Sequence, residues 1–267
     1  MNSRLDQALV ARGLCDSREK AKRAVMAGVV RVNGQVARKA SDTVREADAL
    51  ALDAMEKFVS RGGHKLEHAL DHFALDVRGL TAVDLGASTG GFTDCLLQRG
   101  AVRVFAVDVG QGQLAWKLRN DPRVVVLEKT NARELRSDQL PAVSGQRSGD
   151  GSQESGVGSQ PTQLTVHVVV VDCSFISLRK ILPTAVALLA AGGRIVALVK
   201  PQFEAGKAEA DKGEGVITDP AIHARVLAEL ETFVKTELPG IAWRGVTESP
   251  LLGPAGNKEF LVLLERV

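Results

Sequence analysis

Residues 82–94 read AVDLGASTGGFTD, which is an apolar strand followed by a glycine-rich turn and the start of a helix. The strand carries Asp84, and the glycines at 86, 90 and 91 would let the backbone of the turn approach a ligand closely. The first turn of a helix leaves N–H groups without partners, so an anionic or nucleotide ligand can be held there. The spacing GxxxGG differs from the GxGxxG of dinucleotide sites and from the GxxxxGK of P-loops. The stretch therefore predicts a ligand-binding turn of an α/β domain.

A second carboxylate, Asp108, ends the next apolar run at residues 102–109. A carboxylate at the end of a neighbouring strand can accept hydrogen bonds from the hydroxyls of an adenosine ribose. Together these features resemble the S-adenosylmethionine site of Rossmann-like methyltransferases, with a structural turn or another nucleotide as the alternatives. The residues expected at this cofactor are Asp84, Gly86, Ala87, Ser88, Gly90, Gly91, Phe92 and Asp108, with Asn131 and Ala132 near the adenine. For Asn131 an ordinary turn after a strand stays open as the alternative.

Short β-rich runs alternate with helix-like stretches on both sides of this turn. Such alternation is typical of a parallel sheet with right-handed crossovers. The β-rich runs lie at 80–85, 102–109, 124–127, 166–171, 195–199 and 260–264, and the helical stretches at 64–73, 93–99, 111–118 and 178–189. The pattern predicts an α/β fold, a Rossmann-like methyltransferase sheet with helices on both faces.

The N-terminal end differs in charge from the rest of the chain. Residues 1–40 hold nine Lys and Arg against three Asp and Glu, a net charge of +6, whereas the other 227 residues carry 25 against 29, a net of −4. Helical spacing at 4–12 and 17–27, followed by Asn33-Gly34 between alternating apolar residues, predicts two helices and a β-hairpin. A basic α+β module of this kind favours a polyanionic partner.

The basic residues expected to contact RNA lie mostly in this module, although a charged helix face can also be merely solvated. They are Arg4, Arg18, Lys20, Lys22, Arg23 and Arg31, with Arg61 and Lys207 as further candidates. Aromatic residues make up only 4% of the chain, so recognition by shape and phosphate is favoured over base stacking.

The organisation that follows is a small α+β domain at 1–60, a joint at 61–63 and an α/β domain at 64–267. A Gly/Ser-rich stretch at 144–163 is expected to be a flexible surface insertion, since it has almost no apolar residues with which to form a core.

Composition sets outer limits on the class of protein. With 45% hydrophobic and 25% charged residues in 267, the chain resembles an ordinary globular protein and not a disordered one. No apolar run approaches the ~20 residues that a membrane-spanning helix needs. Three scattered cysteines and the absence of a secretion signal favour a cytoplasmic protein with reduced thiols. His64, His68 and His72 share a helix face, but nothing beside them indicates a metal site, so no metal is expected.

Methyl transfer to a weakly acidic hydroxyl needs positioned groups that handle its proton and stabilise the developing negative charge. Strand ends are where such sheets bind ligands. Asp172 and Lys200 each follow an apolar run, Glu259 begins the last one, and Lys65 lies near the start of the helix at 64–73.

Five segments carry a family resemblance. VSRGGHKLEHAL (59–70), VDLGASTGGFTDCLL (83–97), VVVDCSFISL (169–178), LVKPQFEAGK (198–207) and GPAGNKEFLVLLER (253–266) resemble the TlyA family, ribosomal RNA 2′-O-methyltransferases historically named hemolysins. The basic N-terminal segment is similar to the S4-like RNA-binding domain of that family. Only residues 144–163 match nothing in it.

The resemblance implies an FtsJ-like Lys-Asp-Lys-Glu tetrad at Lys65, Asp172, Lys200 and Glu259, with Lys200 handling the proton of the ribose hydroxyl. It further implies transfer of a methyl group from S-adenosylmethionine to a cytidine 2′-hydroxyl of 16S or 23S ribosomal RNA, or both, within ribosomal subunits or free RNA. The alternatives are an RNA-binding protein without catalysis, a pseudouridine synthase that shares the S4-like module, and a membrane-active hemolysin.

Overall fold

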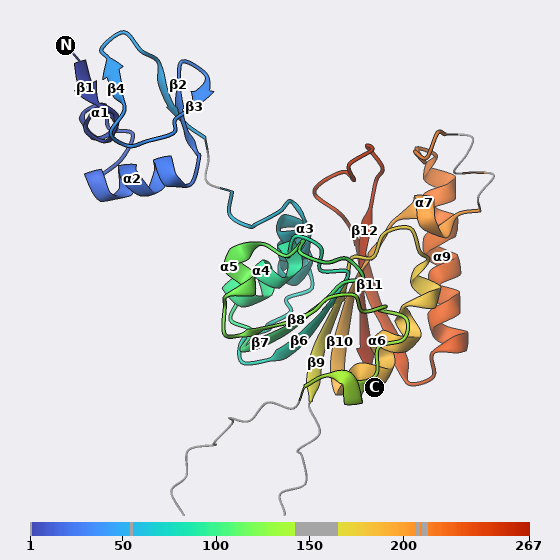
Figure 1. The fold of residues 1–267 in the computed structure, drawn as a ribbon. Coiled ribbons are helices and arrows are strands. Elements are labelled where there is room, and N and C mark those ends of the chain that lie inside the picture. The colour runs from blue at the N-terminus through green and yellow to red at the C-terminus, as the bar shows by residue number, and fades with distance from the viewer. Residues whose placement is uncertain (1, 54–55, 142–164, 207–208, 210–212) are drawn as a thin grey trace, which may run out of the picture. The chain divides into compact units, whose positions relative to one another are not determined.

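The computed structural model describes residues 2–53, 56–141, 165–206, 209 and 213–267 (Figure 1). The chain divides into two compact units, Met1–Lys57 and Phe58–Val267. The Gly/Ser-rich stretch at 144–163 and Lys207 lie outside the described residues.

The first unit is a small α+β domain with its own core. Its elements are β1 (Asn2–Arg4), α1 (Leu5–Ala11), α2 (Arg18–Met26), β2 (Val30–Val32), β3 (Gln35–Val36), β4 (Thr43–Arg45) and β5 (Leu50–Leu52). The predicted hairpin is confirmed, since β2 pairs with β3 around Asn33 and Gly34, whose φ angles are 51° and 81°. Leu5, Leu9 and Val25 are among the residues that close the core. The pairings of β1 with β4 and of β2 with β5 were not predicted.

The second unit is built on a seven-stranded sheet in the order β11-β12-β10-β9-β6-β7-β8. The strands are β6 (Thr81–Leu85), β7 (Arg103–Val107), β8 (Val124–Leu127), β9 (Val166–Val171), β10 (Leu189–Val199), β11 (Ile241–Glu248) and β12 (Phe260–Arg266). The five strands from β6 to β10 are parallel to one another. The β12 strand runs antiparallel to both β10 and β11.

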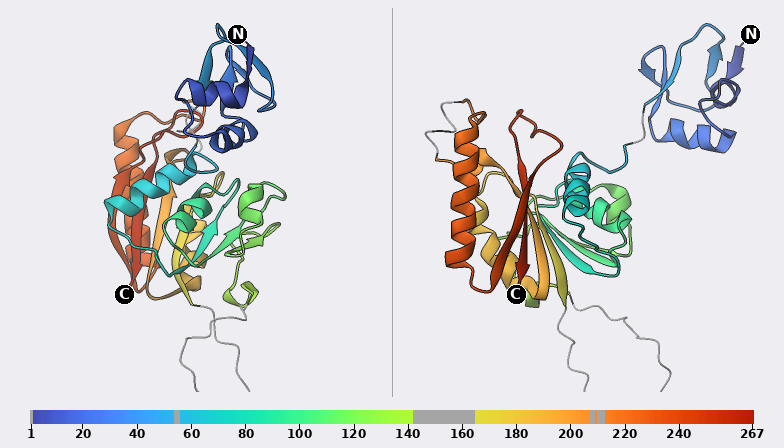
Figure 2. Two further views of the ribbon diagram at one scale, coloured as in Figure 1. Left: turned by 90° about the vertical axis from the view of Figure 1, so that its left-hand side faces the viewer. Right: turned by 180° about the vertical axis from the view of Figure 1, so that it is seen from behind.

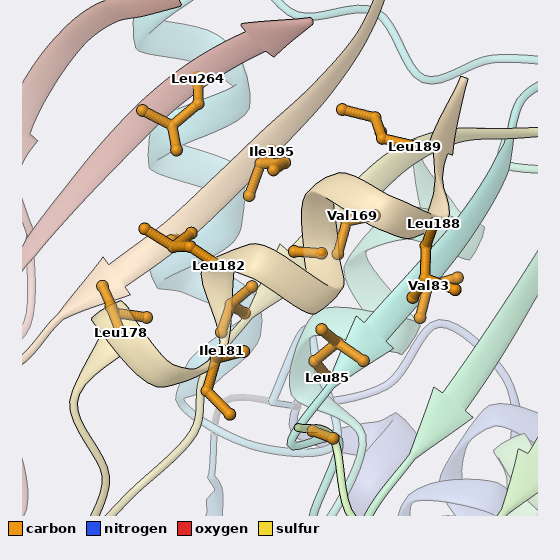
Figure 3. Packing of buried hydrophobic residues seen from close by; sticks show 14 of the residues in the cluster. Val83, Leu85, Val169, Leu178, Ile181, Leu182, Leu188, Leu189, Ile195 and Leu264 are labelled. Atoms are coloured by element: carbon orange, nitrogen blue, oxygen red, sulfur yellow. The ribbon is translucent and has the colours of Figure 1, made fainter. Parts of the chain in front are cut away.

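Successive residues of the central strands face opposite sides of the sheet and build two cores. Val83 and Leu85 of β6 belong to one core, which Figure 3 shows packed against the helix that follows Ile181, whereas Ala82 belongs to the other. Because both faces are buried, these strands are mainly apolar, as expected for the parallel part of a sheet.

Helices cover both faces of this sheet (Figure 2), which confirms the predicted fold class. One face carries α3 (Gly62–His72), α4 (Gly91–Gln98) and α5 (Trp116–Arg119), and the other carries α6 (Leu182–Leu188) and α9 (Pro220–Glu237). A short helix, α7 (Pro201–Glu204), follows β10, and the 3-10 turns η1 (Ser137–Gln139) and η2 (Leu178–Lys180) complete the described elements.

Some elements differ from the prediction. Neither α9 nor β11 was predicted, β10 begins at Leu189 instead of residue 195, and the expected helix at 178–189 is split into η2 and α6. The β11 strand lies at the edge of the sheet, and most of its residues are partly or fully exposed, so it has no continuous apolar run.

None of the helices in the described part of the chain is both long and apolar enough to cross a membrane.

Candidate active site

The parallel strands β6, β9 and β10 end at the same side of the sheet, and β12 begins there. Val171 of β9 is in register with Leu85 of β6 and with Ala197 of β10. At the end of β10, Val199 pairs with Phe260, the first residue of β12. Three of the four predicted catalytic residues are next to these paired residues: Asp172 follows Val171, Lys200 follows Val199 and Glu259 precedes Phe260. The sheet register therefore brings them to the same side of the sheet.

Lys200 is held by acceptors from the segment that leaves β9. Its Nζ lies 2.6 Å from Asp172 Oδ1 and donates hydrogen bonds to Ser174 Oγ at 2.9 Å and to the Cys173 carbonyl oxygen at 3.3 Å. The Lys200 side chain is 9% exposed and that of Asp172 is 24% exposed. The Lys200 ammonium is therefore fixed in place and neutralised by Asp172, while part of the Asp172 side chain stays exposed to solvent.

Lys65 and Glu259 form a second ion pair, and both side chains are buried. The sequence places Lys65 there through the close packing of the first turn of α3. A Cβ on Gly63 would lie 2.2 Å from Cγ of the Phe58 ring, so only glycine fits at that position. The structure thus joins the four predicted catalytic residues as two ion pairs, one of them fully buried.

Asp84 lies beneath the glycine-rich turn and has no exposed surface. Its Oδ2 accepts hydrogen bonds from the Thr93 backbone N–H at 3.0 Å and from Thr93 Oγ1 at 2.7 Å, while Oδ1 has no hydrogen-bond partner among the described residues. Burial raises the pKa of Asp84 to about 7. This carboxyl group anchors the first turn of α4 and does not reach the surface where a ligand would lie.

The turn itself packs tightly against the end of β9. Gly86 has a φ of 89°, and a Cβ there would lie 2.8 Å from the Asp172 carbonyl oxygen. Gly90 has a φ of 97°, and a Cβ there would lie 2.3 Å from Leu118. Phe92 is buried in the core, so it supports the turn from below. The glycines therefore permit the close packing that brings the turn beside Asp172.

A small pocket opens next to this turn, on the side of β7. Asp108 lines it, and its two carboxylate oxygens accept hydrogen bonds from the backbone N–H groups of Ser88 at 2.8 Å and Gly110 at 2.7 Å. Each carboxylate oxygen has a second lone pair, so Asp108 can still accept from ligand hydroxyls. The lining residues are Ala87, Ser88, Ala106, Asp108, Gly110, Gln113, Leu114, Val126 and Glu128.

Of the ten predicted cofactor residues, Ala87, Ser88 and Asp108 line this pocket. Glu128 was not predicted, although it follows β8 directly, as Asp108 follows β7, and this strand-end position could have revealed it. Asn131 and Ala132 do not line the pocket. Asn131 Oδ1 accepts from the Arg133 N–H at 3.1 Å, and Ala132 is buried in the core.

The predicted RNA-binding cations of the first unit are mostly ion-paired. Arg4 and Arg18 donate to the buried Asp6 at 3.1 and 3.2 Å, and the hydrogen bonding of Arg4 lowers the pKa of Asp6 to about 2. The other pairs are Lys20 with Asp16, Lys22 with Glu19, and Arg31 with Asp53. Arg4 and Arg18 therefore have a structural role that the sequence analysis missed.

Several exposed cations of the first unit have no acidic partner among the described residues. Arg23 was predicted, whereas Arg38, Lys39 and Arg45 were not. In the second unit, Arg61 donates to the Leu252 carbonyl oxygen at 2.9 Å.

The histidine stripe on α3 is engaged in ordinary contacts. His68 Nε2 lies 3.1 Å from Thr247 Oγ1, and the His68 and His72 rings stack with centroids 6.0 Å apart. Among the residues that the structure describes, no three His, Cys, Asp or Glu side chains gather as metal ligands would.

Known proteins share both units. The FtsJ-like methyltransferase family matches residues 58–266, and the S4 domain matches residues 3–50. The chain is 46% identical to a Mycobacterium tuberculosis protein named 16S/23S rRNA (cytidine-2′-O)-methyltransferase TlyA, over 98% of this chain and 89% of that protein. It is 37% identical to Hemolysin A of Brachyspira hyodysenteriae, over 97% and 98% of the two chains.

A solved structure agrees with these sequence matches. A hemolysin-named protein of Streptococcus thermophilus superposes with a TM-score of 0.69 at 40% identity, covering 100% of this chain and 89% of that one. The chain thus combines an S4 domain with an FtsJ-like methyltransferase domain. Its nearly full-length relatives include one named as a TlyA methyltransferase and one named as a hemolysin. The chain belongs to the TlyA family of FtsJ-like methyltransferases.

Proposed function

We propose that this protein transfers a methyl group from S-adenosylmethionine to the ribose 2′-hydroxyl of cytidine in 16S or 23S ribosomal RNA, or both. The observation that carries the proposal is the pair of ion pairs at one sheet edge, Lys65 with Glu259 and Lys200 with Asp172. The glycine-rich turn touches Asp172 through Gly86 and lines the adjoining pocket through Ser88.

The residues around the small pocket at Asp108 are proposed to contact the adenosine part of the cofactor. Asp108 would accept from the ribose hydroxyls, and the apolar side chains of Leu114 and Val126 would contact the adenine. S-adenosylmethionine, when bound, supplies an electrophilic methyl group on a positively charged sulfur. A carboxylate near that sulfur would favour its charge, and Asp172 follows the strand next to the turn.

Lys200 is the residue proposed to act on the 2′-hydroxyl. Its ammonium would stabilise the negative charge that develops on the 2′-oxygen as the hydroxyl loses its proton to the Asp172 carboxylate, the ion-pair partner of Lys200. Asp172 and Ser174 fix the direction of the Lys200 side chain. Lys65 and Glu259 would orient the ribose from the other side, and their mutual neutralisation limits the cost of burying both charges.

The first unit is proposed to dock on ribosomal RNA as the S4-like domain of residues 1–60, followed by a joint at 61–63 and the methyltransferase domain at 64–267. Arg23 and the other exposed, unpaired cations are suited to phosphate contacts, which supply most of the affinity for RNA. A ribosomal substrate would also make the cytoplasm the site of action.

The test is transfer of labelled methyl from S-adenosylmethionine to purified small and large ribosomal subunits and to free ribosomal RNA. We expect label that maps to ribose 2′-oxygens of cytidine. Lys200→Ala should lower the rate by about 100-fold or more, the scale of a positioned group that assists proton transfer. Lys235→Ala, a change of the same kind on the exposed face of α9, should leave the rate unchanged. Wild-type protein that binds the cofactor but labels none of these RNAs would refute the proposal.

A further inference from the structure

One segment connects β9 to η2 and carries part of the Lys200 site. It supplies the Cys173 carbonyl oxygen and Ser174 Oγ, both of which accept hydrogen bonds from Lys200 Nζ. Its middle residue, Phe175, has a φ of 63° and is 91% exposed. A left-handed conformation is unfavourable for a non-glycine residue, so other contacts must hold the segment in this shape.

Glu204, the last residue of the helix that Lys200 caps, supplies such contacts. Its Oε2 accepts from Ser177 Oγ at 2.6 Å, and its Oε1 accepts from the Leu178 backbone N–H at 2.7 Å. Burial raises the pKa of Glu204, against the two hydrogen bonds and the charge of Arg179, which lower it. A partly buried carboxylate with both oxygens engaged on one segment is well suited to hold that segment in place.

These contacts close a ring that includes Lys200. Lys200 is the N-cap residue of α7, and Glu204 is the last residue of the same one-turn helix. From Glu204 the ring passes through Ser177 along the segment to Ser174, and from Ser174 back to Lys200. A second contact reinforces it, since the Phe203 and Phe175 rings lie 5.2 Å apart.

We infer that Glu204 is a positioning residue for methyl transfer: by anchoring Ser177 and Leu178 it holds Ser174 and the Cys173 carbonyl where they fix the Lys200 ammonium beside Asp172. The inference rests on the proposed function. Glu204 itself contacts neither the Lys200 side chain nor Asp172 in the described hydrogen bonds and ion pairs, so it acts through the segment alone.

The test compares Glu204→Ala with Glu204→Gln in the full chain, with ribosomal subunits as substrate. Removal of both acceptors should lower kcat about tenfold or more, while the KM for RNA and the Kd for S-adenosylmethionine stay within twofold. A glutamine keeps one acceptor oxygen for the Leu178 N–H, and its amide can donate to the Ser177 hydroxyl, so Glu204→Gln should recover most of kcat. Glu231→Ala, which removes a glutamate of α9 paired with Lys235, is the matched control.

A double-variant cycle sharpens the result. Ser177→Ala removes one of the two hydrogen bonds and should lower kcat less than Glu204→Ala does. Ser177→Ala combined with Glu204→Ala should be no worse than Glu204→Ala, because both changes break the same link. Additive losses, an unchanged kcat in Glu204→Ala, or a loss that parallels reduced cofactor binding would overturn the positioning role. Absence of transfer by the wild type would overturn the proposed function as well.

Discussion

Two fully buried carboxylates, Asp84 and Asp6, have opposite protonation behaviour because their neighbours differ. Among the described residues, Asp84 receives hydrogen bonds from Thr93 alone, and burial raises its pKa to about 7. Asp6 receives hydrogen bonds from two guanidinium groups, those of Arg4 and Arg18, and the bonds from Arg4 are the main reason why its pKa is lowered to about 2. Burial is thus the main cause of the raised pKa of Asp84, whereas hydrogen bonds from arginine are the main cause of the lowered pKa of Asp6.

Asp84 should make stability depend on pH. Its folded pKa of about 7 lies above the ordinary value of 3.8, so the folded state binds the proton more tightly than the unfolded state does. The resulting stabilisation is complete below pH 4 and is lost as the pH rises through 7. Asp84→Asn removes this titration but keeps an acceptor for Thr93. Between pH 4 and 8 the free energy of unfolding of the wild type should fall relative to that of Asp84→Asn by on the order of 4 kcal/mol. Urea titrations of both proteins measure the difference, and parallel pH profiles would contradict the prediction.

Variants of the buried ion pair of Lys65 and Glu259 can distinguish its contribution to stability from its contribution to catalysis. Lys65→Met alone leaves the Glu259 charge without its partner and should destabilise the second unit by about 3–5 kcal/mol. Lys65→Met with Glu259→Leu removes both charges at similar volume and should restore most of that stability. Methyl transfer should stay low in both variants. Denaturation and transfer assays on the same preparations test this, and recovery of activity together with stability in the double variant would show that the pair is only structural.

At the scale of single residues, the position of a side chain that directly follows a buried strand could be predicted from the sequence. Asp108, Asp172 and Lys200 are of this kind, because the end of an apolar run fixes the sheet edge at which they emerge. Prediction failed where the outcome depends on which partner a side chain finds in space. Arg4 could not be assigned to Asp6 without the fold, and the Gly86 contact with Asp172 joins segments far apart in the chain.

Elements follow the same division. The central strands could be predicted because burial on both faces makes them mainly apolar runs. The β11 strand lies at the sheet edge with largely exposed residues, so its pattern is weak. The α9 helix did carry usable signals that the sequence analysis left unused. Asp219 caps it, Pro220 stands at its start, and Val226, Leu230 and Val234 repeat every four residues on its buried face.

The glycine-rich turn offers a test at the level of an element. Gly86→Ala places a Cβ in a left-handed backbone conformation and 2.8 Å from the Asp172 carbonyl oxygen. Gly79 has a φ of 73° but open space around it, so Gly79→Ala is a control for the backbone cost alone. That cost is about 1–2 kcal/mol. Gly86→Ala should destabilise more than the control and should weaken cofactor binding at least tenfold, as measured by calorimetry. Equal effects of the two substitutions would mean that the close approach to Asp172 is unimportant.

At the scale of the whole molecule, the candidate RNA-binding cations of the first unit and the candidate active site lie in different units. The first unit has a core of its own, and many of its cations are bound to its own acidic residues. Arg23, Arg38, Lys39 and Arg45 are among the exposed cations that form no salt bridge with its described residues. The second unit holds both ion pairs of the candidate active site and the Asp108 pocket. Changes to the free cations should therefore alter RNA affinity without altering the chemistry.

Alanine at all four of these positions should weaken binding to ribosomal RNA. It should also reduce the slope of log Kd against log salt by about one for each phosphate that the removed cations would have neutralised. The Kd for S-adenosylmethionine, and kcat at saturating RNA, should stay unchanged, since no residue of the second unit is altered.

The control removes four positive charges from the second unit instead, by alanine at Arg194, Arg225, Lys235 and Arg244, all of which are paired with acids. Its salt dependence should match that of the wild type, because arginines and lysines already neutralised by carboxylates release few counterions when RNA binds. If both quadruple variants lose RNA affinity equally, net charge and not the unpaired cations of the first unit governs binding.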